Sequence, residues 1–410
     1  MPSDTLAILP YGRQEIDDDD IDTVAAVLRG DWLTTGPTVE RFEKALARNV
    51  GATYAIVCTS CTAGLHMAAE VAGISAGDLV VVPSVTFVAT ANAVRYAGGD
   101  VLFADVDPET GLMGPAQLEA ALEKAGDLPV RAVMPVHLAG QCADPPAIAN
   151  IADRSGLTVI EDAAHAIGGH YGAGDEAAAV GACRHSDMTV FSFHPVKTIT
   201  MGEGGAVTTT DVRLARRLRR IRSHGMVRDP ADFLQPNLAL DRDGATNPWY
   251  AEMHELGYNY RATDIQCALG LSQLAKLDGF VARRRQLVAR YDAQLAPLAP
   301  TVRPLGRAAG CDPGWHLYVV RIDFDRLGMD RAAVMNWLRD RGIGSQVHYL
   351  PVHMQPYYRR RYGEQSLPGA ESYYRQALSL PLFPAMTDAD VDRVCDALAK
   401  LVAIASLSVA

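Results

Sequence analysis

Lys197 lies in surroundings that differ from those of every other lysine in the chain. It follows the apolar segment Phe191–Phe193 and precedes the glycine-rich segment Gly202–Gly205. A lysine in apolar surroundings has a lowered pKa, and its unprotonated amine can form an imine with a carbonyl group. The alternative is that the Lys197 side chain extends from a buried turn to solvent and has no chemical role. Other motifs must decide between these two interpretations. The remaining lysines lie in amphipathic, charge-bearing helical patterns: Lys44, Lys124, Lys276 and Lys400.

Asp162 is a second candidate for chemistry, because it follows the apolar run Leu157–Ile160. A carboxylate at the tip of a buried strand needs a cation or hydrogen-bond donors. The protonated pyridine nitrogen of pyridoxal phosphate is such a cation, and the pairing turns the ring into an electron sink. A cap, a metal ligand or a ribose ligand is the alternative for an aspartate at a strand end. Lys197 also follows a strand, which favours the pyridoxal phosphate interpretation.

The segment Thr59–Leu65 joins a predicted strand to a predicted helix and is built of small and polar residues. Free backbone N–H groups at a helix start bind anions, so a phosphate group fits there. Ser192, five residues before Lys197, can add a hydroxyl contact. An ordinary strand-to-helix turn that binds nothing is the alternative interpretation of this pattern.

Short apolar runs alternate with helical patterns between about residues 52 and 210, which predicts repeated strand–helix–strand units. Such units form an α/β fold, a mostly parallel sheet with helices on both faces, and ligands bind beyond the carboxyl ends of its strands. All the candidate residues above lie at such ends. The predicted strands are Tyr54–Cys58, Leu79–Val82, Val101–Ala104, Val130–Val136, Leu157–Glu161, Met188–Phe193 and Ala206–Thr209.

The remainder of the chain predicts a smaller α+β domain at the C-terminal end. Residues 262–295 read as one long helix that joins the two domains, and residues 211–223 as a shorter helix. The segment Phe233–Tyr250 is rich in proline and asparagine and is predicted to be a loop insertion. In the smaller domain, the pattern predicts a strand and two helices: Trp315–Ile322, Ala332–Arg341 and Asp388–Ala403.

Composition narrows the class of protein. The chain has 410 residues, 49% hydrophobic content and a net charge of -10, as expected for a soluble protein of two or three domains. Seven scattered cysteines do not suggest a disulfide framework. Since Met1–Pro10 lacks a signal-peptide pattern and no apolar run has membrane-spanning length, we expect a cytoplasmic protein without membrane contact.

Metal and nucleic-acid binding are both disfavoured by the sequence. The pairs Cys58/Cys61, His165/His170 and His348/His353 lack the partners or spacing of zinc sites, so no metal site is predicted. The acidic balance argues against broad nucleic-acid binding. The segment Arg213–Arg222 is nevertheless strongly basic, and reads either as a phosphate-binding surface or as a solvated outer helix.

Three motifs together resemble one enzyme family, the DegT/StrS sugar-nucleotide aminotransferases. They are FSFHPVK with GEGG (Phe191–Gly205), EDAAHA (Glu161–Ala166) and LGYNYRATDIQCALGLSQL (Leu256–Leu274). The resemblance implies a fold-type I pyridoxal phosphate-dependent transferase with a seven-stranded sheet, active as a homodimer with shared active sites. It also implies an N-terminal arm (1–20), a large cofactor-binding domain (21–285) and a small C-terminal domain (286–410).

The resemblance assigns a role to each site residue by its position in the motifs. Lys197 matches the catalytic lysine that binds pyridoxal phosphate covalently as an internal aldimine. Asp162 matches the partner of the pyridine nitrogen, His165 a residue that contacts the cofactor ring and Phe87 the aromatic stacked on it. The phosphate-binding positions are Ser60, Cys61, Thr62, Ser192 and, from the neighbouring subunit, Asn259. The predicted sugar-nucleotide residues are Tyr11, Trp32, Leu33, Thr34, Thr35, His316, Leu317 and Tyr318.

Further segments resemble the family branch that serves pseudaminic acid biosynthesis, among them YGRQ, DWLTTGPTVERFEKAL and QVHYLPVHMQPYY. This implies transfer of an amino group from L-glutamate to C4 of UDP-2-acetamido-2,6-dideoxy-β-L-arabino-hex-4-ulose, giving UDP-4-amino-4,6-dideoxy-N-acetyl-β-L-altrosamine. A 4-aminotransferase for another keto-sugar, of the UDP-bacillosamine or GDP-perosamine type, is the alternative. A sugar 3-dehydratase is disfavoured, because that branch has histidine at the position of Lys197. An inactive scaffold with a regulatory or nucleic-acid-binding role is the alternative from another class.

Overall fold

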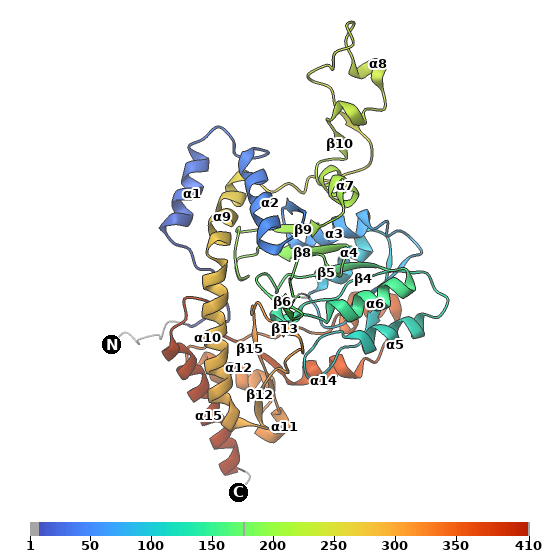
Figure 1. The fold of residues 1–410 in the computed structure, drawn as a ribbon. Coiled ribbons are helices and arrows are strands. Elements are labelled where there is room, and N and C mark those ends of the chain that lie inside the picture. Colours follow the sequence, from blue (N-terminus) through green and yellow to red (C-terminus); the bar gives the residue numbers. More distant parts are fainter. Residues whose placement is uncertain (1–7, 175–176, 409–410) are drawn as a thin grey trace.

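The computed structural model describes residues 8–174 and 177–408, and its largest element is a seven-stranded sheet in the order β1-β9-β8-β5-β4-β2-β3 (Figure 1). The strands β8, β5, β4, β2 and β3 pair in parallel, whereas β9 is antiparallel to both of its neighbours. The predicted mostly parallel sheet is therefore confirmed. Its strands are β1 (Tyr54–Cys58), β2 (Leu79–Pro83), β3 (Asp100–Ala104), β4 (Val130–Val133), β5 (Thr158–Asp162), β8 (Met188–Ser192) and β9 (Gly205–Thr209).

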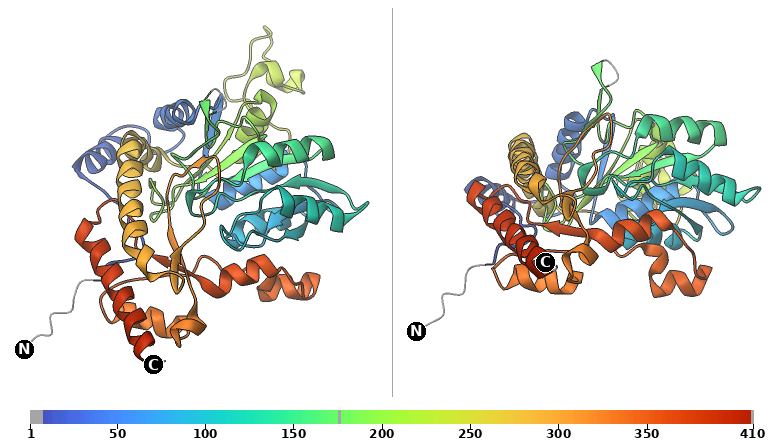
Figure 2. Two further views of the ribbon diagram at one scale, coloured as in Figure 1. Left: turned by 60° about the horizontal axis from the view of Figure 1, so that its bottom comes forward. Right: turned by 90° about the horizontal axis from the view of Figure 1, so that it is seen from below.

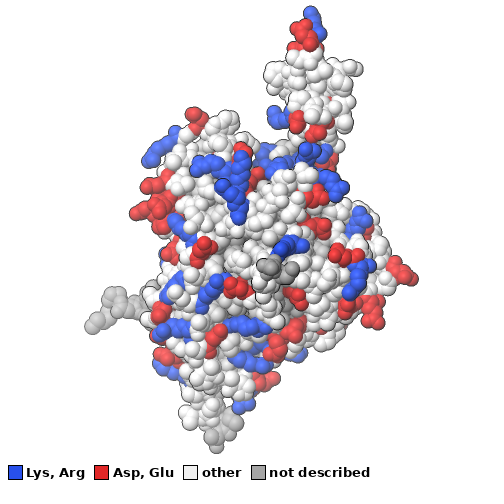
Figure 3. All heavy atoms as spheres, in the orientation of Figure 1, with Lys and Arg blue, Asp and Glu red and all other residues white. Residues whose placement is uncertain are grey.

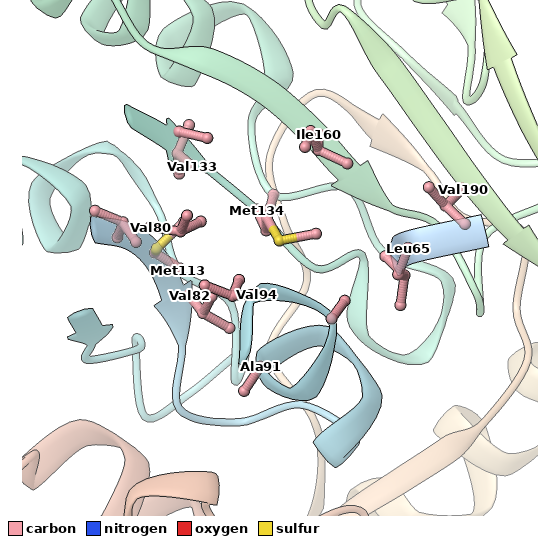
Figure 4. Packing of buried hydrophobic residues seen from close by; sticks show 14 of the residues in the cluster. Leu65, Val80, Val82, Ala91, Val94, Met113, Val133, Met134, Ile160 and Val190 are labelled. Carbon is pink, nitrogen blue, oxygen red and sulfur yellow. The ribbon is translucent and has the colours of Figure 1, made fainter. Parts of the chain in front are cut away.

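Helices cover both faces of this sheet, and side chains of the strands alternate between two hydrophobic cores. In β1, Ile56 and Cys58 face one core, and Ala55 and Val57 face the other. Figure 4 shows part of the first core, where Leu65 and other apolar residues from helices and strands pack together. The covering helices are α2 (Pro37–Val50), α3 (Cys61–Val71), α4 (Val88–Tyr96), α5 (Pro115–Ala125), α6 (Pro145–Ser155), α7 (Val212–Arg222) and α9 (Asp264–Ala275).

A second, smaller group of elements builds the C-terminal part around its own core (Figure 2). Its antiparallel sheet has the order β12-β14-β15, and the closing helix α15 (Asp388–Ser408) lies along α10 (Leu277–Leu295). The smaller α+β unit is confirmed. Its other elements are η4 (Ala296–Leu298), β12 (Val302–Pro304), β14 (Tyr318–Ile322), α11 (Phe324–Leu327), α12 (Arg331–Arg339) and β15 (Ala377–Leu380). Three further elements of the C-terminal part pack against the core of the large sheet instead: η5 (Val352–Met354), α13 (Pro356–Tyr362) and α14 (Pro368–Gln376).

Helix α10 connects the two units. Leu277 and Val281 pack in the core beneath the large sheet, and Leu287 and Val288 pack in the core of the smaller unit. The predicted boundary between residues 285 and 286 lies at this change, and it stays a prediction. At the N-terminus, residues 1–7 of the predicted arm lie outside the described residues, and Leu9 packs in the core of the smaller unit.

The predicted long helix over residues 262–295 is wrong in one respect, because it is two helices. The backbone leaves the helical path at Lys276, which has φ -99 and ψ -3 and separates α9 from α10. Lys276 forms ion pairs with Asp17 and Asp20 at the start of α1 (Asp18–Leu28). No glycine or proline marks the break, so only these tertiary contacts reveal it.

Strand β4 is shorter than predicted and ends at Val133 instead of Val136. Pro135 follows, and proline cannot donate a hydrogen bond to a sheet ladder. Val136 keeps only an isolated bridge with Asp162. The predicted strand Trp315–Ile322 likewise begins later, at Tyr318.

The predicted loop insertion is part of a projecting segment, residues 226–254, which extends away from the sheet (Figure 1). The carboxylate of Glu252 organises it by accepting hydrogen bonds from the backbone of Leu234 and Gln235 and from the side chains of Tyr250 and His254. The segment contains β10 (Met226–Val227), η3 (Pro230–Asp232), α8 (Pro236–Ala239) and β11 (Glu252–Met253).

A short sheet and a loop helix complete the structure. The strands β6 (His170–Tyr171), β7 (Ala178–Ala179) and β13 (Cys311–Asp312) pair in the order β13-β6-β7, and the 3-10 helix η1 (Leu138–Gly140) follows β4. Across the described ranges, no helix combines the length and the apolar composition that crossing a membrane requires.

Candidate active site

A cavity of about 630 Å³ lies at the carboxyl ends of β1, β2, β5 and β8. This is the edge at which parallel sheets bind ligands. The residues come from distant parts of the chain, because the ends of four strands supply one to three of them each and Tyr11 and His316 come from elsewhere. Ten residues predicted from the sequence line this cavity: Tyr11, Ser60, Cys61, Thr62, Phe87, Asp162, His165, Ser192, Lys197 and His316.

Lys197 reaches the cavity from a turn after β8, in which its backbone N–H donates to the carbonyl of His194 at 2.9 Å. Burial lowers the pKa of the Lys197 amine to about 8, although the nearby Asp162 carboxylate favours the charged form. The unprotonated form, which attacks carbonyl groups, is therefore far more populated near neutral pH than in an exposed lysine, at about a tenth of the amine at pH 7.

Asp162 ends β5 and is held by two neutral donors. The hydroxyl of Thr90 donates to its Oδ2 at 2.6 Å, and the backbone N–H of Ala164 donates to its Oδ1 at 3.0 Å. Burial raises the pKa of this carboxyl group. A buried carboxylate on a cavity wall is stabilised by a cationic ligand, and a protonated pyridine nitrogen carries that charge.

The start of α3 forms an anion-binding corner of the cavity. Ser60 caps the helix by accepting a hydrogen bond from the Ala63 N–H at 3.2 Å. The amides of Cys61 and Thr62 occupy the first turn, whose N–H groups have no partner within the helix itself. Gly205 packs against this corner, since a Cβ there would lie 2.5 Å from the carbonyl carbon of Ser60. These residues fit the phosphate group of pyridoxal phosphate.

Two histidines, His165 and His316, form another part of the cavity wall. The ring centroids of His165 and His316 are 4.6 Å apart, and both rings are buried. Burial, followed by the positive charge of Lys197, lowers the pKa of each well below its usual range. Phe87 caps the N-terminus of α4 and is 57% exposed, so its ring is available to a flat ligand.

Five predicted residues lie on the surface, outside this cavity. The segment Trp32–Thr35 is exposed, and it is tied to the start of α9 by a bridge between Thr34 and Thr263. Asn259 is also exposed and pairs with Ser223 through its backbone. Within this single chain, therefore, these residues do not meet the predicted cofactor-binding positions.

Leu317 and Tyr318 are also separated from the cavity, although His316 lines it. Leu317 is buried in the core of the large sheet. Tyr318 stacks on Tyr291 with centroids 4.5 Å apart, and its hydroxyl donates to Asp292 at 2.7 Å. Its side chain belongs to the core of the smaller unit, so the structure gives it no contact with a ligand in the cavity.

Several cavity residues were missed from the sequence. Thr90, which does not line the cavity but holds Asp162, was also missed; it could have been found, because it lies one helical turn after Phe87. His348 and Tyr349 stand within the motif QVHYLPVHMQPYY, which supplied the resemblance but no role. Other cavity residues without a predicted role are Thr86, His194, Glu203, Gln346 and Val347.

The basic helix α7 makes most of its contacts with other parts of this chain. It buries an apolar stripe of Ala215, Leu218 and Ile221. Four of its arginines are paired: Arg222 donates to Glu43 at 2.5 Å, Arg217 and Arg220 both contact Glu255, and Arg213 pairs with Asp211. Charges of both signs are mixed on the face shown in Figure 3, which favours the outer-helix interpretation.

Comparisons with known proteins agree with this geometry. The model of the DegT/DnrJ/EryC1/StrS aminotransferase family matches residues 14–399. The spore coat polysaccharide biosynthesis protein SpsC of Bacillus subtilis (strain 168) is 38% identical over 397 residues, covering 96% of this chain and 97% of SpsC.

Solved structures show the same similarity. Helicobacter pylori PseC, an aminotransferase involved in the biosynthesis of pseudoaminic acid, matches with a TM-score of 0.84 and 27% identity over 96% of this chain and 99% of PseC. DesI, solved in the presence of its TDP-sugar product, matches with a TM-score of 0.82 and 30% identity over 98% of this chain and 95% of DesI.

Proposed function

The chain belongs to the DegT/DnrJ/EryC1/StrS aminotransferase family and is a pyridoxal phosphate-dependent sugar aminotransferase, and from this premise we propose its substrates and the roles of its residues. The amino donor is L-glutamate. The acceptor is UDP-2-acetamido-2,6-dideoxy-β-L-arabino-hex-4-ulose, and the product is UDP-4-amino-4,6-dideoxy-N-acetyl-β-L-altrosamine.

The observation that carries this proposal is that Lys197 and Asp162 face one cavity with a helix start beside them. The cavity thus offers an amine, a buried carboxylate and an anion-binding corner, one for each reactive part of pyridoxal phosphate. When bound, this cofactor supplies a carbonyl group that exchanges amines and a ring that accepts electrons.

Lys197 has two roles in the proposal. Its amine binds the cofactor covalently, which requires the unprotonated form that burial favours. Once displaced by the amino donor, the same amine takes up and returns the proton at the reacting carbon. Asp162 would hold the proton on the pyridine nitrogen of the bound cofactor, and Phe87 and His165 would contact its ring.

The sugar specificity rests on the likeness to PseC and on the sequence motifs shared with its branch. A second candidate substrate is suggested by SpsC, which is more similar in sequence at 38% identity and is named for spore coat polysaccharide biosynthesis. This observation supports a different keto-sugar nucleotide as the alternative acceptor, and the bacillosamine and perosamine types are the candidates that the sequence motifs leave open.

We also propose that the enzyme works as a homodimer in which each protomer completes the cavity of the other. The exposed positions of Asn259 and of Trp32–Thr35 support this, because residues matched to family ligand contacts lie on the surface of a single protomer. In the dimer, Asn259 of one protomer reaches the phosphate in the other, and Trp32–Thr35 lie beside the sugar nucleotide.

The absorption spectrum of the bound cofactor tests the substrate. The enzyme is first converted to its aminated form with L-glutamate and freed of donor. The β-L-arabino and the α-D-xylo epimers of UDP-2-acetamido-2,6-dideoxy-4-hexulose are then added separately. Return of the original spectrum with the L-arabino epimer alone supports the proposal. Return of the spectrum with the D-xylo epimer alone assigns the enzyme to the bacillosamine type. If neither epimer restores the spectrum, both compounds are excluded as substrates.

A further inference from the structure

Ala139 has an unusual backbone conformation next to the active site. Its φ of 60° and ψ of 3° lie in the left-handed region, which is unfavourable for an alanine. Close packing holds it there, since a Cβ on the neighbouring Gly140 would lie 2.3 Å from the carbonyl oxygen of Gly314. In this conformation both backbone groups of Ala139 serve the cavity wall. Its N–H donates to Nδ1 of His165 at 3.3 Å, and its carbonyl accepts from the N–H of His316 at 3.0 Å.

The contact with Ala139 determines which nitrogen of His165 carries the proton. A backbone N–H is only a donor, so Nδ1 must be the unprotonated acceptor nitrogen. Burial and the charge of Lys197 keep the ring neutral by lowering its pKa well below the usual range. The single proton of the neutral ring is therefore on Nε2, which lies 3.1 Å from the hydroxyl oxygen of Tyr349.

The Nε2–H group of His165 therefore donates a hydrogen bond to the hydroxyl oxygen of Tyr349. The O–H group of Tyr349 can then donate its own proton to a different acceptor. Burial, and then the charge of Asp162, raise its pKa well above the usual range, so the hydroxyl stays protonated. Tyr349 lines the cavity, with its ring 5.9 Å from the ring of Phe87. Within the described part of the chain, no second hydrogen bond of this hydroxyl is formed, so its donor is directed to a ligand.

The surroundings of this donor suit an uncharged oxygen. The neighbouring rings are Phe87, His165 and His348, and burial followed by the charge of Lys197 lowers the pKa of His348 to about 3. A carboxylate of the amino donor is best bound by a cation such as a guanidinium group, which this wall does not offer. A keto or hydroxyl oxygen of a sugar needs only a neutral donor.

We propose that Tyr349 is a specificity-determining residue, whose hydroxyl donates a hydrogen bond to an oxygen of the sugar substrate beside the reacting carbon. The backbone of Ala139 sets the direction of this bond through His165, which makes Ala139 and His165 positioning residues for Tyr349. The inference rests on the proposed function, because it requires that a keto-sugar nucleotide enters this cavity.

The replacement Tyr349→Phe tests the proposal, because it removes only the hydroxyl. The two halves of the reaction are followed separately in the holoenzyme by the absorbance of the cofactor. We expect the half with L-glutamate to stay within about 2-fold of wild type, and kcat/KM for the keto-sugar to fall about 10- to 100-fold. The affinity for the 4-amino sugar nucleotide product, measured by calorimetry, falls with it.

Tyr358→Phe is the matched control, since the Tyr358 hydroxyl is also hydrogen bonded, to Asn92 at 2.7 Å, but lies outside the cavity. It should leave both halves unchanged. An equal loss in both halves for Tyr349→Phe, or a shift of the cofactor spectrum before sugar is added, overturns the proposal, because the hydroxyl then contacts the cofactor or supports the fold.

A double-mutant cycle tests the role of His165. In a His165→Met background Tyr349 has lost the partner that orients it, so adding Tyr349→Phe should change the sugar half-reaction by less than about 3-fold. Full additivity of the two replacements would contradict the link through His165.

If the wild type aminates no keto-sugar, the proposed function and this inference are both wrong. If it does and Tyr349→Phe has wild-type kinetics, only the inference falls.

Discussion

The cavity and the exposed segments of this protein hold two sets of residues that the same family motifs predict, and they behave differently in a single protomer. Lys197 and Asp162 follow strands of one sheet and meet in the cavity. Asn259 and Trp32–Thr35 lie on surface loops, away from it. The ends of one sheet therefore bring together the residues matched to cofactor binding, whereas a single chain does not bring Asn259 and Trp32–Thr35 to the cavity, and the proposed homodimer would do so.

Replacing Lys197 by alanine should have the largest effect, because no other cavity residue is matched to covalent binding of the cofactor. We expect turnover to fall by about 10⁴-fold or more, with loss of the absorbance of the covalently bound cofactor. Lys124→Ala, at an exposed position in the last turn of α5, is the matched control and should be fully active. Near-normal turnover of Lys197→Ala would contradict the assignment of Lys197 as the lysine that binds the cofactor.

Asp162→Asn should have the next largest effect. The amide keeps the size of the side chain and a hydrogen bond with Thr90 but removes the charge that stabilises a protonated pyridine. We expect kcat to fall about 100-fold or more, whereas Thr90→Val, which removes one neutral donor, should cost about 10-fold. Steady-state kinetics of both variants measure this. Equal effects would mean that the hydrogen bond matters and the charge does not.

The pH dependence of cofactor attachment should reflect the lowered pKa of Lys197. The unprotonated amine reacts, so the attachment rate of the apoenzyme rises about 10-fold per pH unit below the pKa. It should level off above about pH 8, the pKa that burial sets for this amine. Stopped-flow absorbance on mixing apoenzyme with pyridoxal phosphate gives the profile. A rate that still rises toward pH 10.5 would show that the lysine is not desolvated.

Mixing two inactive or impaired variants tests whether the surface residues act across a dimer. Asn259→Ala should lose about 10-fold in activity, and a mixed dimer with Lys197→Ala restores one intact cavity. An equimolar mixture after subunit exchange should therefore recover about a quarter of wild-type activity. Each variant incubated alone is the control. Recovery no greater than the mean of the two parents would place Asn259 and Lys197 of one site in the same chain.

Much of the large sheet could be predicted from the sequence, because its strands are short apolar runs separated by helical patterns. Tyr54–Cys58 is a strand with the predicted bounds. The errors arise where tertiary contacts decide, as at Lys276, where ion pairs with α1 accompany a break that no proline or glycine announces. Tyr318 was predicted in the sugar-nucleotide site because the segment His316–Tyr318 matches the family, whereas its side chain packs against Tyr291 in the core of the smaller unit.

By itself, the sequence determined the chemistry of the candidate site: a lysine in apolar surroundings, an acid at a strand end and small residues at a helix start. Local patterns encode these features, since strand ends and helix starts depend on nearby residues. Only the tertiary structure decided that Tyr349 lies against His165, which is 184 residues away, and that Ala139 orients that histidine. Such contacts depend on how whole elements pack, so no local spacing announces them.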